Sequence, residues 1–227
     1  MNIAIIPARG GSKRIPRKNI KFFHGKPMIA WSILAAKNAG CFDRIIVSTD
    51  DAEIAAVAQE YGAKVPFMRP ADIANDYATT GDVICHAIKW LSQQGEMPER
   101  VCCLYATAPF VEPEDLREGL ALLTADNQCQ FAFSATRFGF PIQRAIKLDA
   151  SGQVSMFHPE HLLTRSQDLE EAYHDAGQFY WGKASAWLTK APIFAAHSKV
   201  VLLPSFRVQD IDTPDDWLRA ERLFAIK

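Results

Sequence analysis

Short apolar runs alternate with longer amphipathic segments along the first half of the chain. Residues 2–7 form a continuous apolar run of strand length, which is typical of a strand covered on both faces in a parallel sheet. Residues 43–50, 63–69 and 100–106 repeat this pattern. The hydrophobic pattern therefore predicts a buried strand at each of these places.

Between these runs, apolar residues recur every three or four positions. The helical spacing covers residues 28–39, 51–62, 79–95 and 112–125, and each of these segments predicts a helix. Alternation of strand and helix is typical of a doubly wound α/β layer around a mostly parallel sheet. Ligands of such sheets bind outside the carboxyl ends of the strands, so the loops there are the candidate site.

The pattern changes over residues 137–186, where Phe, Pro, His and charged residues follow one another without a helical period. We expect an irregular or β-hairpin insertion here, outside the core of a single domain that spans residues 1–227. The pattern resumes in a closing helix, which Thr213 can cap and Pro214 can begin. The inward face of that helix is expected to carry Trp217, Leu218, Leu223 and Phe224.

Composition and charge exclude several classes of protein. The chain has 25 basic and 26 acidic residues and a formal net charge of -1, so no global charge attracts it to nucleic acid or to an anionic membrane. No apolar stretch reaches the roughly 18 residues of a membrane span, and we expect no signal peptide. The 5 cysteines show no C-x-x-C spacing, which indicates free thiols in a reducing cytoplasm.

A basic, glycine-containing loop follows the first strand. It brings together Arg9, Gly10, Gly11, Ser12, Lys13, Arg14, Arg17, Lys18 and Asn19. Glycines let backbone N–H groups turn toward an anion, and the cationic side chains neutralise it. A merely solvated loop is the alternative, but these charges are spaced by small and rigid residues at a predicted strand end. The loop matches neither the Walker A pattern nor G-x-G-x-x-G, so it indicates a triphosphate site of another kind.

Asp210 and Asp212 are candidate ligands for a metal ion. In an extended segment, residues two positions apart point to the same side. Mg²⁺ is commonly held by one or two protein carboxylates and takes its other ligands from phosphate and water. Capping of the last helix would explain Asp212 or Thr213, but it leaves Asp210 without a role.

The chain resembles the CMP-sialic acid synthetase family in segments that occur in the same order: PARGGSKRIPRKN, STDD, RPADIANDYATTGDV, CCLYATAPF and DIDTPDDW. The resemblance covers nearly the whole chain. It implies a Rossmann-like nucleotidyltransferase sheet, with residues 137–186 as a small β-rich region that makes a homodimer and completes the partner's acceptor site. It also implies a cytidylyltransferase that joins CMP from CTP to the anomeric hydroxyl of an acidic nonulosonic sugar and releases pyrophosphate.

The resemblance assigns roles to particular residues. Asp210 and Asp212 match aspartates that bind catalytic magnesium, and Lys13 is the cation expected nearest the reacting phosphate. The nucleotide is expected to contact the basic loop through Arg9, Gly10, Gly11, Ser12, Lys13, Lys18 and Asn19. Arg69 and Thr80 complete this set, although Asp76, Thr79 and Thr80 also precede a helix, where capping is the more common use of threonine.

The acceptor region resembles the pseudaminic acid branch of that family. Ala176 and Tyr105 stand where N-acetylneuraminate enzymes carry asparagine and glutamine. The implied acceptor has a carboxylate, two acylamino groups and a methyl group at C9. The candidates to bind it are Arg165 for the carboxylate, Gln167, His174 and Gln178 for the amides, and Tyr180 for apolar ring edges.

Other interpretations keep part of this scheme. N-acetylneuraminate, legionaminate or Kdo as the acceptor would preserve the reaction and change only the sugar. A nucleotide-binding regulatory module without catalysis is the alternative outside the enzymes. That module predicts substitutions at Lys13, Asp210 or Asp212, and the sequence shows none.

Overall fold

A computed structural model describes residues 1–75 and 77–226 of the chain. Asp76, which the sequence places before a helix, lies outside the described residues. Within these ranges, no helix is both long enough and apolar enough to cross a membrane.

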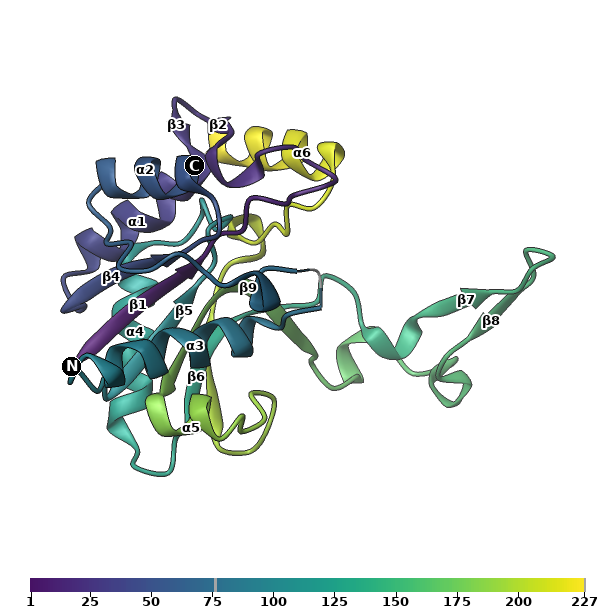
Figure 1. Ribbon diagram of the computed structural model, residues 1–227. Helices are drawn as coiled ribbons and strands as arrows, with labels where there is room; N and C mark the ends of the chain where they lie inside the picture. The colour runs from purple at the N-terminus through teal and green to yellow at the C-terminus, as the bar shows by residue number, and fades with distance from the viewer. Residues whose placement is uncertain (76, 227) are drawn as a thin grey trace.

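A 6-stranded sheet forms the centre of the molecule (Figure 1). In spatial order its strands are β10 (Ser198–Leu202), β6 (Phe131–Arg137), β9 (Tyr173–Lys183), β5 (Arg100–Leu104), β1 (Asn2–Pro7) and β4 (Arg44–Ser48). Neighbouring strands run parallel except where β9 pairs with β5 and β6. The expected mostly parallel α/β sheet is therefore confirmed, with one antiparallel strand near its middle.

Helices cover both faces of this sheet. One face packs against α1 (Met28–Ala39), α2 (Ala52–Glu60) and α4 (Pro113–Ala125), and the other packs against α3 (Thr80–Gln93) and α5 (Ala184–Leu188). A third cluster joins α6 (Pro214–Ala225) to the hairpin of β2 (Phe22–Phe23) and β3 (Lys26–Pro27). Short 3-10 helices lie at Lys18–Ile20, Ala71–Ile73, Ile142–Arg144, Pro159–His161, Ser166–Asp168 and Ser205–Arg207.

The closing helix agrees with the prediction from the sequence except at one residue. Thr213 caps α6 and Pro214 begins it, as predicted. Trp217 is buried, but Leu218 is 47% exposed, so its prediction as an inward residue is wrong. Leu218 follows Trp217 by one position, which turns it about 100° away around the helix.

Residues 63–69 do not form the predicted strand. They make only isolated bridges, at Lys64 with Ile46 of β4 and at Met68 with Thr49, the residue after β4. Pro66 lies between these bridges and has no N–H to donate, so a continuous ladder is interrupted there.

The segment between β6 and β9 projects from the sheet as an arm (Figure 1). This arm, residues 138–172, carries a hairpin of β7 (Ile146–Leu148) and β8 (Val154–Met156). The predicted insertion of residues 137–186 is wrong at its end, because β9 and α5 return to the core. Phe179 and Trp181 of β9 are 0% exposed. A strand buried on both faces shows no alternation, and the polar start of β9 conceals its pairing.

Candidate active site

A cavity of about 640 Å³ opens at the carboxyl ends of β1 and β5. Most of its polar lining comes from residues that the sequence assigns to the nucleotide: Arg9, Ser12, Lys13, Lys18, Asn19, Arg69 and Thr80. Arg14, Asn75, Tyr105 and Asp212 also line it. Gly10 and Gly11 belong to the same loop but do not line the cavity. The structure thus gathers distant cationic groups around one hollow, which suits a polyanionic ligand.

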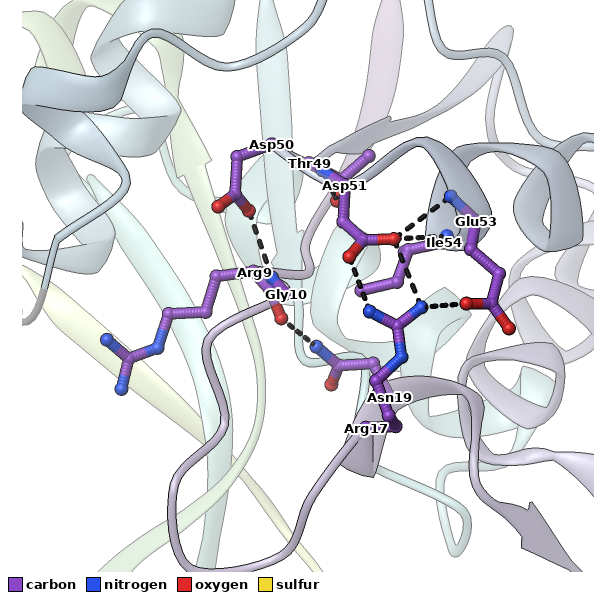
Figure 2. Close-up of polar contacts among 9 residues, drawn as sticks. All are labelled: Arg9, Gly10, Arg17, Asn19, Thr49, Asp50, Asp51, Glu53 and Ile54. Atoms are coloured by element: carbon purple, nitrogen blue, oxygen red, sulfur yellow. Dashed lines mark hydrogen bonds and ion pairs between the residues drawn. The ribbon is translucent and has the colours of Figure 1, made fainter.

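Carboxylates at the end of β4 fix the shape of the basic loop, as Figure 2 shows. Arg17 bonds Asp51 through two nitrogens, at 2.5 and 3.2 Å, and also contacts Glu53. The Gly10 N–H donates to Asp50 Oδ1 at 2.9 Å. Arg17 therefore serves the loop itself and does not line the ligand cavity, and its hydrogen bond to Asp51, with its charge as a smaller contribution, lowers the pKa of that carboxyl group.

Gly10 is required by this arrangement. A Cβ atom at this position would lie 2.7 Å from Asp51 Oδ2, closer than a methyl group can approach a carboxylate oxygen. Asn19, which is buried, donates from Nδ2 to the Arg9 carbonyl oxygen at 2.9 Å. In Figure 2 the Arg9 side chain leads away from the cluster of Arg17 and Asp51. Asn19 therefore orders the loop backbone from which Arg9 projects.

Arg69 is a buried cation on the cavity wall. It is 7% exposed, and its guanidinium donates to the Ser48 carbonyl oxygen. Among the described residues, nothing bonds its Nε. Burial lowers the pKa of Arg69, and the charge of Asp50 opposes that effect. Because Arg69 also lines the cavity, its charge favours an anion arriving from outside the chain.

The carboxylates of Asp210 and Asp212 lie close enough to repel one another. Loss of hydration, with the charge of Asp212 second, raises the pKa of Asp210. Asp212 pairs with Arg14 Nη2 at 2.7 Å and with Lys18 Nζ at 3.3 Å. No group of three or more His, Cys, Asp or Glu forms a metal-binding cluster in the described ranges. Asp212 lines the cationic cavity, and Asp210 lies outside its lining. Two carboxylates this close to one another nevertheless fit Mg²⁺, because phosphate and water can complete its coordination.

A buried ion pair holds the segment that precedes these aspartates. Arg207 bonds Asp115 at 2.8 and 3.0 Å and lies 2.9 Å from Glu112. Gln178 donates from Nε2 to the Arg207 carbonyl oxygen at 2.6 Å. The sequence predicted that Gln178 binds the acceptor. Its side chain is buried, however, and it lines neither the cationic cavity nor the second cavity described below. Its observed contact positions the Asp210 segment.

A second cavity of about 370 Å³ adjoins the first. Thr80 and Tyr105 line both cavities. The rest of the lining is mostly apolar with a few polar groups: Thr79, Gly81, Asp175, Tyr180, Ala186, Trp187, Lys190, Ala191, Ile193 and Phe194. Tyr180 donates its hydroxyl hydrogen to Asp175, and burial raises the pKa of both Tyr105 and Tyr180. An apolar hollow with a few convergent polar groups is typical of a small-molecule subsite.

The other predicted acceptor residues lie apart from these cavities. Arg165 and Gln167 are on the arm, and Arg165 bonds Asp168 at 2.7 and 3.2 Å. His174 is exposed, and its ring packs against Phe138. Of the predicted acceptor residues, Tyr180 lines the second cavity. No sequence pattern pointed to Asp175 or Lys190. A regular strand would point Asp175 and Tyr180 to opposite faces, and the partner of Lys190, Asp82, lies 108 residues away along the chain.

Comparison with known proteins gives consistent similarities. A family model described as cytidylyltransferase matches residues 3–214. The chain is 49% identical to a pseudaminic acid cytidylyltransferase of Campylobacter jejuni subsp. jejuni serotype O:2, over 99% of this chain and 97% of that protein. It is 35% identical to the CMP-N,N'-diacetyllegionaminic acid synthase of Legionella pneumophila subsp. pneumophila, over 99% and 96% of the two chains.

The fold has a counterpart among solved structures. A CMP:2-keto-3-deoxy-manno-octonic acid synthetase complexed with CTP superposes with a TM-score of 0.72 and 17% identity. The match covers 99% of this chain and 98% of that one. At this identity the likeness concerns the fold.

The start of α3, where the two cavities meet, depends on Asp82. Its carboxylate accepts from the Thr79 hydroxyl at 2.6 Å and pairs with Lys190 Nζ at 2.8 Å. These contacts lower its pKa to about 2. Because that value lies below the roughly 3.9 of an unfolded aspartate, the stabilisation is present above about pH 4 and is lost as the pH falls toward 2.

We therefore expect Asp82→Asn to lower the free energy of unfolding by about 1 kcal/mol at pH 7, the usual loss for a helix cap. Urea unfolding at several pH values should show this difference shrinking as the pH approaches 2. Glu118→Gln, on the exposed side of α4, is the control and should change stability little. A difference that stays constant from pH 7 to pH 2 would contradict the role given to the carboxylate.

Proposed function

This chain belongs to the cytidylyltransferase family, and from that premise we propose that it transfers CMP from CTP to the anomeric hydroxyl of pseudaminic acid and releases pyrophosphate. The observation that carries the proposal is the junction of two unlike cavities at Thr80 and Tyr105. One is cationic and suits a triphosphate, while the other is mostly apolar and suits a sugar with methyl and acylamino groups. The relatives named above support this acceptor.

The larger cavity holds the nucleotide in this proposal. Arg69 places a largely buried positive charge on the wall of this cavity, so it is the natural partner of a phosphate or of the nucleoside. Arg9 and Lys13 border the same space. We assign Lys13 to the α-phosphate, where negative charge develops as the sugar oxygen attacks and pyrophosphate departs. Fixed cations at that point stabilise the transition state more than the ground state.

Asp210 and Asp212 hold Mg²⁺ in this proposal. The bound ion neutralises phosphate charge and helps to orient the triphosphate. Arg14 and Lys18, which pair with Asp212 in the chain alone, exchange this carboxylate for phosphate oxygens. The ion pair of Arg207 with Asp115 keeps the Asp210 segment in place during that exchange.

The second cavity receives the acceptor sugar. The carboxylate of this sugar is attached to the anomeric carbon. The carboxylate and the anomeric hydroxyl therefore face the cationic cavity together, beyond Tyr105. Ile193 and Phe194 provide an apolar wall for the methyl group at C9, which replaces the hydroxymethyl group of N-acetylneuraminate. Legionaminate shares this methyl group and is the second candidate, in keeping with the 35% identical relative.

We further propose that the protein is a homodimer and that the arm reaches a second copy. The arm exposes a series of apolar side chains: Phe138, Phe140, Ile142, Ile146, Leu148, Val154, Phe157, Leu162 and Leu163. An exposed apolar surface of this extent is typical of an interface. Arg165 and Gln167 belong to the same arm and line neither cavity of their own chain, so a partner's acceptor site is their expected place.

We place the reaction in the cytoplasm. The cysteines Cys41, Cys85, Cys102, Cys103 and Cys129 are all free, and all but Cys41 are buried. Unpaired thiols fit a reducing compartment.

The acceptor is tested by pyrophosphate release from CTP and Mg²⁺ with four acids offered separately: pseudaminic, legionaminic, N-acetylneuraminic and Kdo. We expect the highest kcat/KM for pseudaminic acid. A preference for another acid would support the proposed reaction and overturn the assignment of pseudaminic acid as the acceptor. If folded protein that binds CTP released no pyrophosphate with any of the four acids, the regulatory module would be favoured.

The metal assignment is tested by Asp212→Ala. We expect turnover to fall by roughly 100-fold or more, since triphosphate charge is no longer neutralised, while the melting temperature stays nearly unchanged. The Mg²⁺ concentration for half-maximal CTP binding should rise as well. Asp215→Asn, at the exposed start of α6, is the matched control. Near-normal turnover of folded Asp212→Ala would remove the assignment.

The dimer is tested by light scattering and by Leu163→Asp. Leu163 is 92% exposed in the single chain, so a charge there costs the folded monomer little but opposes burial between two copies. We expect a dimer for the unmodified protein and a shift toward monomer for this variant. Ile226→Asp, at another exposed apolar position, should remain dimeric. A monomeric unmodified protein would refute the proposal.

A further inference from the structure

β9 departs from regular pairing beside the second cavity. Along its ladder with β6, Tyr180 pairs with Phe133, and the next pair joins Asp175 to Ala135. One residue of β6, Ser134, therefore faces four residues of β9, 176–179. Gly177 lies within this bulge at φ 61°, a left-handed conformation that glycine adopts without strain.

The bulge is a built feature, because its backbone groups are satisfied. Ser134 is 0% exposed, and its hydroxyl oxygen accepts from the N–H groups of Gln178 at 3.3 Å and Phe179 at 3.2 Å. Those amides would otherwise be buried without a partner, which is costly. Bulges of this kind often redirect a side chain toward a site.

The consequence of the bulge is that Asp175 meets Tyr180. In a regular strand, residues five positions apart point to opposite faces and lie roughly 16 Å apart. Here the Tyr180 hydroxyl donates to Asp175 Oδ2, and the Gly177 N–H donates to Oδ1 at 2.8 Å. Both side chains line the second cavity. The carboxylate is thus held in one orientation on a largely apolar wall.

This carboxylate suits a particular ligand group. An ionised carboxylate only accepts hydrogen bonds, and each oxygen of Asp175 keeps capacity for another donor after its present contact. The proton of Tyr180 is already committed to Asp175. Lys190, on the same cavity, is paired with Asp82 at 2.8 Å, so it does not neutralise Asp175. A ligand that brings an N–H donor would meet this remaining capacity.

The charge of Asp175 also selects an orientation. An acidic sugar entering with its own carboxylate toward Asp175 would be repelled, whereas the reverse orientation directs that carboxylate to the cationic cavity. The acylamino end of the sugar then faces Asp175. An acylamino group presents an N–H donor next to a methyl group, which matches a carboxylate set among Trp187, Ile193 and Phe194.

We infer that Asp175 is a specificity-determining residue, whose carboxylate, oriented by Tyr180 and Gly177, accepts the N–H of an acylamino group on the acceptor sugar. This inference rests on the proposed function and extends it to one residue that no resemblance assigned. Tyr180 acts through Asp175 and is a positioning residue.

The test is Asp175→Asn, which keeps the size of the side chain and removes its charge. We expect kcat/KM for pseudaminic acid to fall about 10- to 100-fold, the usual range for a hydrogen bond to a charged group. The change should appear mainly in the KM for the sugar, while the KM for CTP and the melting temperature stay within error. Tyr180→Phe should produce a smaller change of the same kind.

Two comparisons separate specificity from structure. Asp126→Asn, at the end of α4 and away from both cavities, should behave like the unmodified protein. Kdo has no acylamino group, so Asp175→Asn should change its inhibition constant as a competing acid less than it changes the KM for pseudaminic acid.

The outcomes distinguish this inference from the proposed function. An unchanged KM for the sugar in Asp175→Asn, with normal activity of the unmodified protein, overturns the inference and leaves the function intact. A joint rise of both KM values with a lower melting temperature shows a structural role and also overturns it. No pyrophosphate release by the unmodified protein with pseudaminic acid overturns both.

Discussion

The shape of the larger, cationic cavity depends on the ion pair between Arg17 and Asp51. The positively charged side chains of the basic loop repel one another. The ion pair fixes one of them, Arg17, to the end of β4 and so holds the loop in place. The same carboxylate accepts from backbone N–H groups at the start of α2, so loop and helix share one fixed point. Gly10 fits against it because it has no side chain. The remaining cations of the loop are thereby arranged around a common hollow.

The parts of the fold that the sequence predicts are those governed by local rules. Thr79, Thr213 and Pro214 mark helix starts through contacts within one turn. The continuous apolar runs of β1 and β5 reflect burial on both faces of the sheet. β9 escaped prediction because its place between β5 and β6 is decided by residues far along the chain. Its bulge removes even the short period that would have marked it as a strand.

The residues of the candidate site also divide into those that local sequence predicts and those that distant contacts determine. The basic loop and the two aspartates were visible because their chemistry is concentrated in a few consecutive residues. Gln178 was assigned to the sugar from its neighbours in sequence, yet its side chain turns to the Arg207 carbonyl oxygen. Asp115 and Arg207 meet across the fold, and one sequence carries no trace of such a pair. Arg165 and Gln167 lie on an arm that contacts a second copy of the chain only in the dimer that we propose.

The bulge in β9 has a consequence for how enzymes of this kind could change their substrates. In the proposed function, the parallel strands β1 and β5 end at the nucleotide cavity, while the antiparallel strand β9 presents Asp175 and Tyr180 to the sugar. Ser134 absorbs the backbone irregularity locally, so a substitution at Asp175 or Tyr180 would alter the proposed sugar pocket while the basic loop keeps its anchor at Asp51. Gln178 of the same bulge holds the Asp210 segment through the Arg207 carbonyl oxygen. Selectivity can therefore diverge at the β9 residues that face the sugar, as long as the length of the bulge is preserved.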